Sequence, residues 1–422
     1  MTTHSPGYNT KLVATLALSL GLMSFDQVSI GFLLPFIKPD LHLTNTQIGT
    51  VSSSYWVTFA LASYGVGMLA NTLGSVRTYL IAVLAAFGLC SLLSTMVEGV
   101  NSLLLARAVM GLLAGAILTL VQSLLALGSP PDKVGTNMGL VTGLGGSLCG
   151  LILAPIILVQ IASAAGWRAG YFAIAVPACI AAALVFWNIR RSGEAQAKPV
   201  ANGASTQTLL SGMREIFRHR NIVLCVILCS LYVAYLSLGF TFLPIYLVNI
   251  RHFSPTQMSA LIVVLGVSSI LFTIALPPIS NRFGRKVVLI VACGTSMLTP
   301  LAAHYFEGPV VVLGALMFFG WALAGAGTFS MGIIPAETVD AEVLSRVIGI
   351  VIALGVLLGG LAGPMIAGWS ADRWGAGAPL LVEALCAVIA TCAAMALHET
   401  APGKLARRDN KGPGVPSGTP AE

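Results

Sequence analysis

The sequence predicts an all-α polytopic membrane protein, in which twelve transmembrane helices form two pseudo-symmetric six-helix bundles. Three observations carry this prediction: an apolar composition, long apolar runs separated by polar loops, and an internal repeat. Of the 422 residues, 56% are hydrophobic and only 9% are charged, and the mean hydropathy is +0.90. A soluble domain needs more charge to cover its surface, so this composition indicates a chain that lies in a bilayer.

The charged and sulfur-containing residues give no sign of nucleic-acid, metal or cofactor binding. The formal net charge is +7, but the basic residues lie in loops, without a basic stripe or interleaved aromatic residues. All eight cysteines fall inside apolar segments, where a cysteine is usually a small buried hydrophobe. No nucleophile elbow or phosphate loop is present, because the glycine cluster at 143–146 lies within an apolar run and suits helix packing. We therefore expect no enzyme and no cofactor.

A hydrocarbon core about 30 Å thick needs roughly 20 apolar residues per helix. Measured against that length, the chain contains six spans before and six after a polar stretch at 190–220. The predicted spans lie near residues 12–36, 46–70, 77–97, 102–127, 137–161, 170–189, 221–248, 257–279, 287–304, 309–334, 344–369 and 377–397. The first run is too long for a signal-peptide core and lacks a small-residue cleavage site, so we expect it to remain as a span.

The distribution of basic residues predicts the orientation in the membrane. With the N-terminus in the cytoplasm, 17 of the 22 lysines and arginines are inside, Arg107 lies within a span, and only Lys38, Arg168, Arg251 and Arg373 are outside. Because basic residues favour cytoplasmic loops, this bias predicts a multi-pass inner-membrane protein with both termini in the cytoplasm.

An internal repeat divides the chain into halves. Thr46-Gln47 corresponds to Thr256-Gln257 at an offset of 210 residues. The same offset, or one of 209 for the prolines, relates Gly74 to Gly284, Gly115 to Gly325, Gly139 to Gly349, Gly145 to Gly355, Gly150 to Gly360, Pro35 to Pro244, and Pro155 to Pro364. We therefore predict a bundle at 1–189, a cytoplasmic linker at 190–220, a second bundle at 221–400 and a disordered tail at 401–422.

Short motifs in the loops and in the fourth span resemble the major facilitator superfamily over nearly the whole chain. Residues 67–74 read Gly-Met-Leu-Ala-Asn-Thr-Leu-Gly and residues 281–286 read Asn-Arg-Phe-Gly-Arg-Lys. Both are similar to the cytoplasmic signature Gly-x-Leu-Ala-Asp-Arg-x-Gly-Arg-Lys of that family. Arg107, followed by Gly111 and Gly115, is similar to its Arg-x-x-x-Gly pattern. The resemblance implies two bundles that expose a central site alternately to each side.

The loop motifs also depart from the family pattern. Asn71 and Asn281 stand where the family usually has the aspartate that latches the cytoplasmic gate. An asparagine cannot form that ion pair, so we expect a weaker latch or one made by other groups. The candidate gating residues are Asn71, Arg77, Asn281, Arg282, Arg285, Glu337, Asp340 and Arg346.

Within the family, the run Phe25-Asp26-Gln27-Val28-Ser29 resembles organic-anion symporters, in particular the anion:cation and aromatic-acid:proton groups. The first group usually has arginine where Gln27 stands and glutamate where Ala114 stands, so the resemblance is partial.

Ionisable side chains inside a span are costly and are functional candidates by default. Asp26 lies 14 residues into the first span, about 21 Å along the helix at 1.5 Å per residue. Arg107 lies about 8 Å from the outer end of the fourth span by the same rise, so the two can form a pair. We expect Asp26 to bind the coupling proton, because burial and a nearby arginine change a carboxylate's proton affinity in opposite directions. A packing role is the alternative for each.

Arg107 suits a carboxylate substrate, which its planar fork can bind through two hydrogen bonds. Further candidate substrate contacts, for each of which packing is an equal alternative, are Gln27, Tyr55, Gln122, Tyr232, Tyr235 and Trp321. For Glu383, near the outer end of the last span, an interfacial carboxylate is the favoured interpretation. His304 is expected to be interfacial too.

Together these observations predict a secondary active transporter that carries a small organic anion, a carboxylate, with protons. We expect a monomer in the lipid bilayer. One alternative is a proton-antiporting exporter of hydrophobic compounds, although an unpaired Arg107 would repel a cationic drug. A second alternative is a non-transporting membrane sensor, which would carry a sizeable soluble domain, whereas the longest loop has only about 31 residues.

Overall fold

The structure is a computed structural model that describes residues 6–69, 75–130, 133–189 and 218–401. This part of the chain is helical and contains no strand. In the first half the helices are α1 (Pro6–Asp40), α2 (Asn45–Leu69), α3 (Val76–Ser94), α4 (Val100–Gly128), α5 (Val134–Leu140), η1 (Val141–Leu153), α6 (Ala154–Ala165) and α7 (Trp167–Asn188). In the second half they are α9 (Arg220–Asn249), α10 (Pro255–Phe283), α11 (Arg285–Thr295), α12 (Leu298–Tyr305), α13 (Val310–Phe319), η2 (Ala322–Gly325), α14 (Ala326–Thr328), η3 (Phe329–Ile333), α15 (Ile334–Thr338), α16 (Ala341–Trp374) and α17 (Ala378–Ala396).

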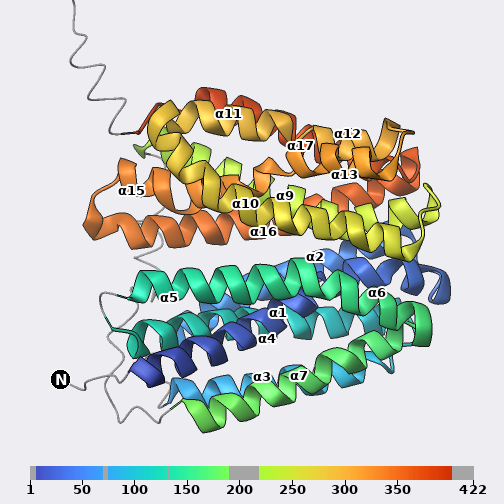
Figure 1. Cartoon of the computed structure of the whole chain (residues 1–422), viewed down its shortest axis with the longest axis horizontal. Helices are drawn as coiled ribbons and strands as arrows, with labels where there is room; N and C mark the ends of the chain where they lie inside the picture. Colours follow the sequence, from blue (N-terminus) through green and yellow to red (C-terminus); the bar gives the residue numbers. More distant parts are fainter. Residues whose placement is uncertain (1–5, 70–74, 131–132, 190–217, 402–422) are drawn as a thin grey trace, which may run out of the picture.

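The helices run side by side along one direction and form two layers (Figure 1). Helices α1–α7 make up one layer and α9–α17 the other. Helices α1 and α9 begin, and α17 ends, at the same end of the bundle, which we call the terminal end. The other end, where α1 finishes at Asp40 and α2 begins at Asn45, is the opposite end.

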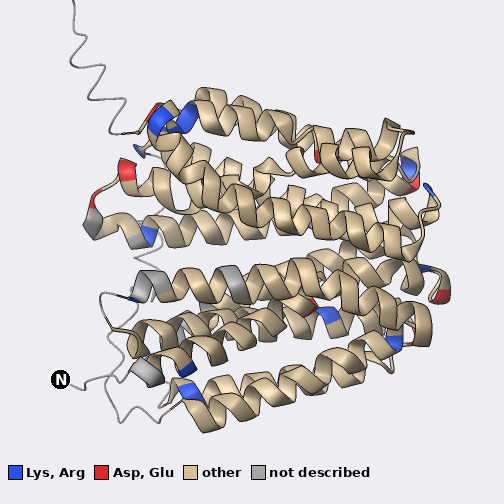
Figure 2. Cartoon of the chain, in the orientation of Figure 1, with Lys and Arg blue, Asp and Glu red and all other residues tan. Residues whose placement is uncertain are grey.

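The predicted number of spans agrees with the structure. Eleven helices in the described residues are long and apolar enough to cross a membrane by length and composition. Helix α2 is not among them, but it has 25 residues and runs beside the others. Lysine, arginine and acidic residues gather at the two ends of the bundle, and its middle is almost free of them (Figure 2). This arrangement is typical of a multi-pass membrane protein.

Glycines at equivalent positions of the two halves allow equivalent pairs of helices to pack closely within each half. A Cβ on Gly115 of α4 would collide with the Phe59 carbonyl oxygen of α2, and one on Gly325 of η2 would approach the Phe272 carbonyl oxygen of α10. Backbones can pack this closely only where a side chain is absent. The sequence repeat at these positions therefore corresponds to a repeated helix–helix contact.

The fifth span changes its helix type where it passes the centre of the molecule. Residues 134–140 are α-helical, Val141–Leu153 form a π-helix, and the α-helix resumes at Ala154. Four glycines in this stretch lower its helix propensity. π-helical turns occur often at functional sites, because they widen the helix locally.

Several predictions fall on residues outside the described part of the chain. Asn71 lies there, as do residues 190–217 of the predicted linker and 402–422 of the predicted tail.

Candidate functional site

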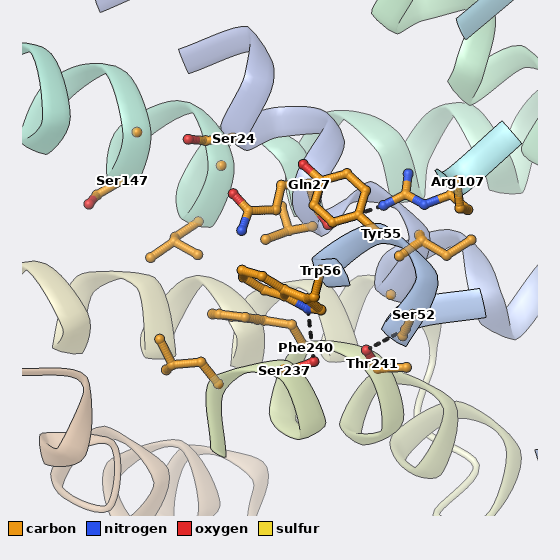
Figure 3. A pocket seen from close by; sticks show the side chains of 17 residues that line it. Ser24, Gln27, Ser52, Tyr55, Trp56, Arg107, Ser147, Ser237, Phe240 and Thr241 are labelled. Atoms are coloured by element: carbon orange, nitrogen blue, oxygen red, sulfur yellow. Dashed lines mark hydrogen bonds between the residues drawn. The ribbon is translucent and has the colours of Figure 1, made fainter. Parts of the chain in front are cut away.

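A cavity of about 250 Å³ lies between the two halves, and Figure 3 shows the side chains around it. Its walls come from α1, α2, α4 and η1 of the first half and from α9 of the second. The lining residues are Ser24, Gln27, Val28, Ile30, Gly31, Ser52, Tyr55, Trp56, Arg107, Gly146, Ser147, Gly150, Leu151, Leu236, Ser237, Phe240 and Thr241. A mostly apolar pocket with a few converging polar groups is the usual form of a small-molecule site.

The predicted pair of Asp26 and Arg107 is present in the structure. Arg107 Nη1 lies 3.4 Å from both Asp26 carboxylate oxygens. Both side chains are buried, with 1% and 0% of the arginine and aspartate exposed. Arg107 lines the cavity and Asp26 does not. The guanidinium therefore stands between the buried carboxylate and the cavity.

The guanidinium is held loosely. Its Nη2 donates to the Gln27 carbonyl oxygen at 3.5 Å, and its carbon lies 4.7 Å from the centre of the Tyr55 ring. Arg107 Nε is buried and has no hydrogen-bond partner in the part of the chain that the structure describes. Tight charge-assisted bonds are about 2.7–2.9 Å long, so these long contacts leave the arginine able to accept a further anion.

The polar groups of the cavity fall into two sets. Ser52 and Thr241 bond each other across the two halves at 3.1 Å, and Trp56 Nε1 donates to Ser237 Oγ at 3.1 Å (Figure 3). In contrast, the side chains of Ser24, Gln27 and Ser147 have no hydrogen bond within the described part of the chain, and neither has the buried Tyr55 hydroxyl. The first three side chains are available to a ligand.

The two halves are joined at the opposite end by Asp372 of α16, which accepts hydrogen bonds from the first residues of α2. One carboxylate oxygen accepts from the backbone N–H of Asn45 at 3.0 Å and its side chain at 2.8 Å. The other accepts from the Thr46 N–H at 2.8 Å and its hydroxyl at 2.6 Å. A carboxylate at a helix N-terminus also interacts favourably with the helix dipole. We call this set of bonds the Asp372 latch.

The structure brings three of the predicted substrate contacts to the cavity and leaves four outside it. Gln27, Tyr55 and Arg107 line the cavity. Tyr235 is fully buried and donates to the carbonyl oxygens of Ser296 and Gly320, and Trp321 Nε1 donates to Ser269. Tyr232 packs against Gly327, and Gln122 is exposed on α4.

The prediction that Glu383 is an interfacial carboxylate is wrong. Its side chain is fully buried, with 0% exposed, and neither carboxylate oxygen has a hydrogen-bond partner among the described residues. Helix α17 packs against α9, α11, α12 and α16, so Glu383 points into the second half. Its depth in the span could be predicted from the sequence, but the direction in which it points could not.

Three of the predicted gating residues, Arg77, Arg285 and Glu337, make contacts within their own halves. Arg77 donates to the Phe186 carbonyl oxygen. Arg285 forms an ion pair with Glu337 at 2.8 Å. The remaining candidates lie at the terminal end of the second half. Arg346 is half-buried there, and the exposed candidates are Asn281, Arg282 and Asp340.

Seven polar or aromatic cavity residues were not among the sequence-based candidates. Of these, Trp56 and Phe240 supply aromatic surface, and the others are Ser24, Ser52, Ser147, Ser237 and Thr241. Small hydroxyl residues are common in membrane helices, so their sequence positions carry no signal. Trp56 could have been noticed because it follows Tyr55 in the polar second span.

Comparison with known proteins gives a family match and several relatives. A family model described as the Major Facilitator Superfamily matches residues 16–364 and 252–419. A hexuronate transporter of Bacillus subtilis (strain 168) is 26% identical over 409 residues, which cover 92% of this chain and 94% of the relative. A tetracenomycin C resistance and export protein of Streptomyces glaucescens is 27% identical over 199 residues, or 47% of this chain and 36% of the relative.

The crystal structure of nucleoside transporter NupG has a similar fold. Its TM-score is 0.73 at 17% sequence identity, and the match covers 92% of this chain and 98% of that one. The family match spans well over half of the chain. This protein therefore belongs to the major facilitator superfamily, and it is a membrane transporter rather than an enzyme.

Proposed function

We propose that this transporter carries a small organic anion together with protons, by alternating access to the central cavity. The observation that carries the proposal is Arg107, which faces the cavity while its only ion pair in the described chain is a loose one with Asp26. An arginine in a low-dielectric cavity favours an anionic ligand, and its fork suits a carboxylate.

Competition for this guanidinium supplies a coupling mechanism. When Asp26 is ionised, it holds Arg107 and reduces the positive charge available to a ligand. When Asp26 takes up a proton, the ion pair is lost and Arg107 can bind the carboxylate of the substrate. Because the two anions use the same cation, proton binding and substrate binding favour each other.

The body of the substrate would lie against the aromatic and hydroxyl groups of the cavity. Trp56 and Phe240 offer flat apolar surfaces, and Ser24, Gln27 and Ser147 offer hydrogen bonds. Both suit a ring with polar substituents. The similarity to a hexuronate transporter supports this choice, because a hexuronate is a hydroxylated ring that carries a carboxylate.

A second candidate is export of hydrophobic compounds by proton antiport. The aromatic walls of the cavity and the similarity to a tetracenomycin C export protein favour it. The buried arginine disfavours a cationic cargo, because such a cargo would lie beside a like charge.

A ligand screen on purified protein separates the two candidates. We expect carboxylates such as hexuronates and aromatic acids to raise the melting temperature, since a ligand that binds only the folded state stabilises it. The matched controls are the corresponding amides, which keep the shape and lose the charge. Stabilisation by lipophilic cations and none by carboxylates would favour the exporter.

We also propose that this transporter lies in the plasma membrane of the cell and that both of its termini lie in the cytoplasm. The support is the bias of basic residues described above. The terminal end of the bundle then faces the cytoplasm, and the Asp372 latch closes the outer end.

Breaking the Asp372 latch should open the cavity to the outside. Asp372→Asn removes the charge that the N-terminus of α2 binds. We expect a loss of about 1–2 kcal/mol, or a five- to thirty-fold rise in the outward-open fraction. A cysteine at Ser52 should then react faster with a membrane-impermeant reagent added to sealed cells.

The neighbouring Arg373→Gln provides the matched control, because Arg373 is exposed and has no hydrogen bond within the described chain. Equal labelling rates in the two variants would contradict the role of the latch. If Asp372→Asn instead made Ser52→Cys more reactive toward a reagent confined to the cytoplasmic side, the orientation would be contradicted.

A further inference from the structure

Glu383 is a second buried acid, which does not line the cavity and has no hydrogen bond or ion pair among the described residues. Its side chain is fully buried in the second half, and both of its oxygens lack hydrogen bonds. No ion pair within the described chain involves it. An ionised carboxylate without a partner is strongly disfavoured in such an interior, so the group must carry a proton in this conformation.

Among the residues that the structure describes, no charged side chain pairs with Glu383 to stabilise its ionised form. The titratable groups that face it are Tyr235 on α9 and Cys386 on α17 itself, and both are ordinarily neutral at pH 7. Helix α11 carries Arg285 and Lys286 at its first residues and Cys293 near its end, and α12 carries His304 in its last turn, where it bonds the Tyr246 hydroxyl at 2.9 Å. The charged residues of α16 lie at its two ends.

Glu383 is in direct contact with the helix that forms the second-half wall of the cavity. A Cβ on Gly239 of α9 would stand 2.9 Å from Glu383 Oε1 and would collide with the Trp321 ring. The next residue, Phe240, lines the cavity and contacts the same Trp321 ring, with centroids 5.5 Å apart. One face of α9 therefore covers Glu383 while the other faces the cavity.

We propose that Glu383 is a second proton-binding site, which keeps its proton while α9 covers it and releases it when α9 moves during the transport cycle. Gly239 lets the backbone of α9 lie directly on the carboxyl group, so a displacement of α9 would change the access of water to it. This inference goes beyond the proposed function, because it concerns a carboxyl group outside the cavity and holds for any cargo.

Infrared spectroscopy of the purified protein tests the first half of the proposal. A protonated carboxylic acid has its own carbonyl band, which shifts when glutamate is labelled with carbon-13. We expect that band in the wild type at neutral pH and its loss in Glu383→Gln, which keeps the size of the side chain. The matched control Glu98→Gln removes an exposed loop carboxylate and should leave the band unchanged.

The second half is tested by following the same band as the pH is raised, in the wild type and in Asp372→Asn. Labelling of Ser52→Cys first establishes that the Asp372→Asn variant is open. If α9 uncovers Glu383 when the protein opens, the band should then disappear at a clearly lower pH in this variant than in the wild type. A band that survives Glu383→Gln in a folded protein overturns the proposal. Identical titrations in the wild type and the opened variant also overturn it, because the proton would then be permanent. Neither measurement uses an anion. If the proposed substrate class is wrong, both measurements can therefore still be interpreted.

Discussion

Asp26→Asn should abolish accumulation driven by a pH gradient while the carrier still binds and exchanges its substrate. Asparagine keeps the shape of the side chain but cannot titrate, so Arg107 is left permanently available to an anion. One pH unit corresponds to about 1.4 kcal/mol per proton. For a monovalent anion and one proton, the wild type should therefore accumulate substrate about tenfold per unit of gradient, and the variant not at all.

The measurement is uptake of a radiolabelled anion into proteoliposomes, with counterflow exchange as the second readout. Counterflow needs no net proton movement, so it should persist in Asp26→Asn. Glu98→Gln, an exposed acid on the loop before α4, is the control and should behave as the wild type. Proton-driven accumulation by a well-folded Asp26→Asn protein would mean that another group carries the coupling proton.

Arg107→Lys should weaken anion binding even though the positive charge is kept. Lysine cannot bind a carboxylate through two parallel hydrogen bonds, and its ammonium would lie differently over the Tyr55 ring. Losing one bond to a charged group costs about 1.5–3 kcal/mol, which is a loss of roughly 10- to 150-fold in affinity. Arg107→Ala should abolish uptake.

The alanine variant needs a control for stability, because it leaves Asp26 buried without its partner. Breaking a buried pair costs about 3–5 kcal/mol. The double variant Arg107→Ala with Asp26→Asn removes both charges, so it should recover much of that stability and still fail to bind anions. Titration calorimetry and thermal unfolding of all three variants separate the two effects. Wild-type affinity in Arg107→Lys would return Arg107 to a packing role.

Much of the fold could be predicted from local properties of the sequence. The length of each apolar run follows from the thickness of the bilayer, so the number of spans could be counted without a structure. The 210-residue offset that relates Gly115 to Gly325 predicted two homologous halves, but the helix contacts that these glycines make could not be predicted. The π-helical stretch at Val141–Leu153 could not be predicted, because its glycines are equally compatible with a regular packed helix.

The candidate site could be predicted only in part. Charge inside a span is rare enough that Asp26 and Arg107 stood out, and their depths were sufficient to pair them. Tyr235 and Trp321 also lie at cavity depth, but depth does not tell which way a helix faces. Both point into the second half, where their polar atoms bond to the backbone or to Ser269.

We propose that an organic anion and a proton cross the membrane together through the Asp26–Arg107 site. The pH change that accompanies anion uptake by proteoliposomes with no imposed pH gradient, recorded with a trapped pH indicator, tests this coupling. We predict that an inward anion gradient alkalinises the external medium and acidifies the interior, and that Asp26→Asn removes this signal while exchange continues. Anion entry without proton movement, or with protons moving the opposite way, would contradict it.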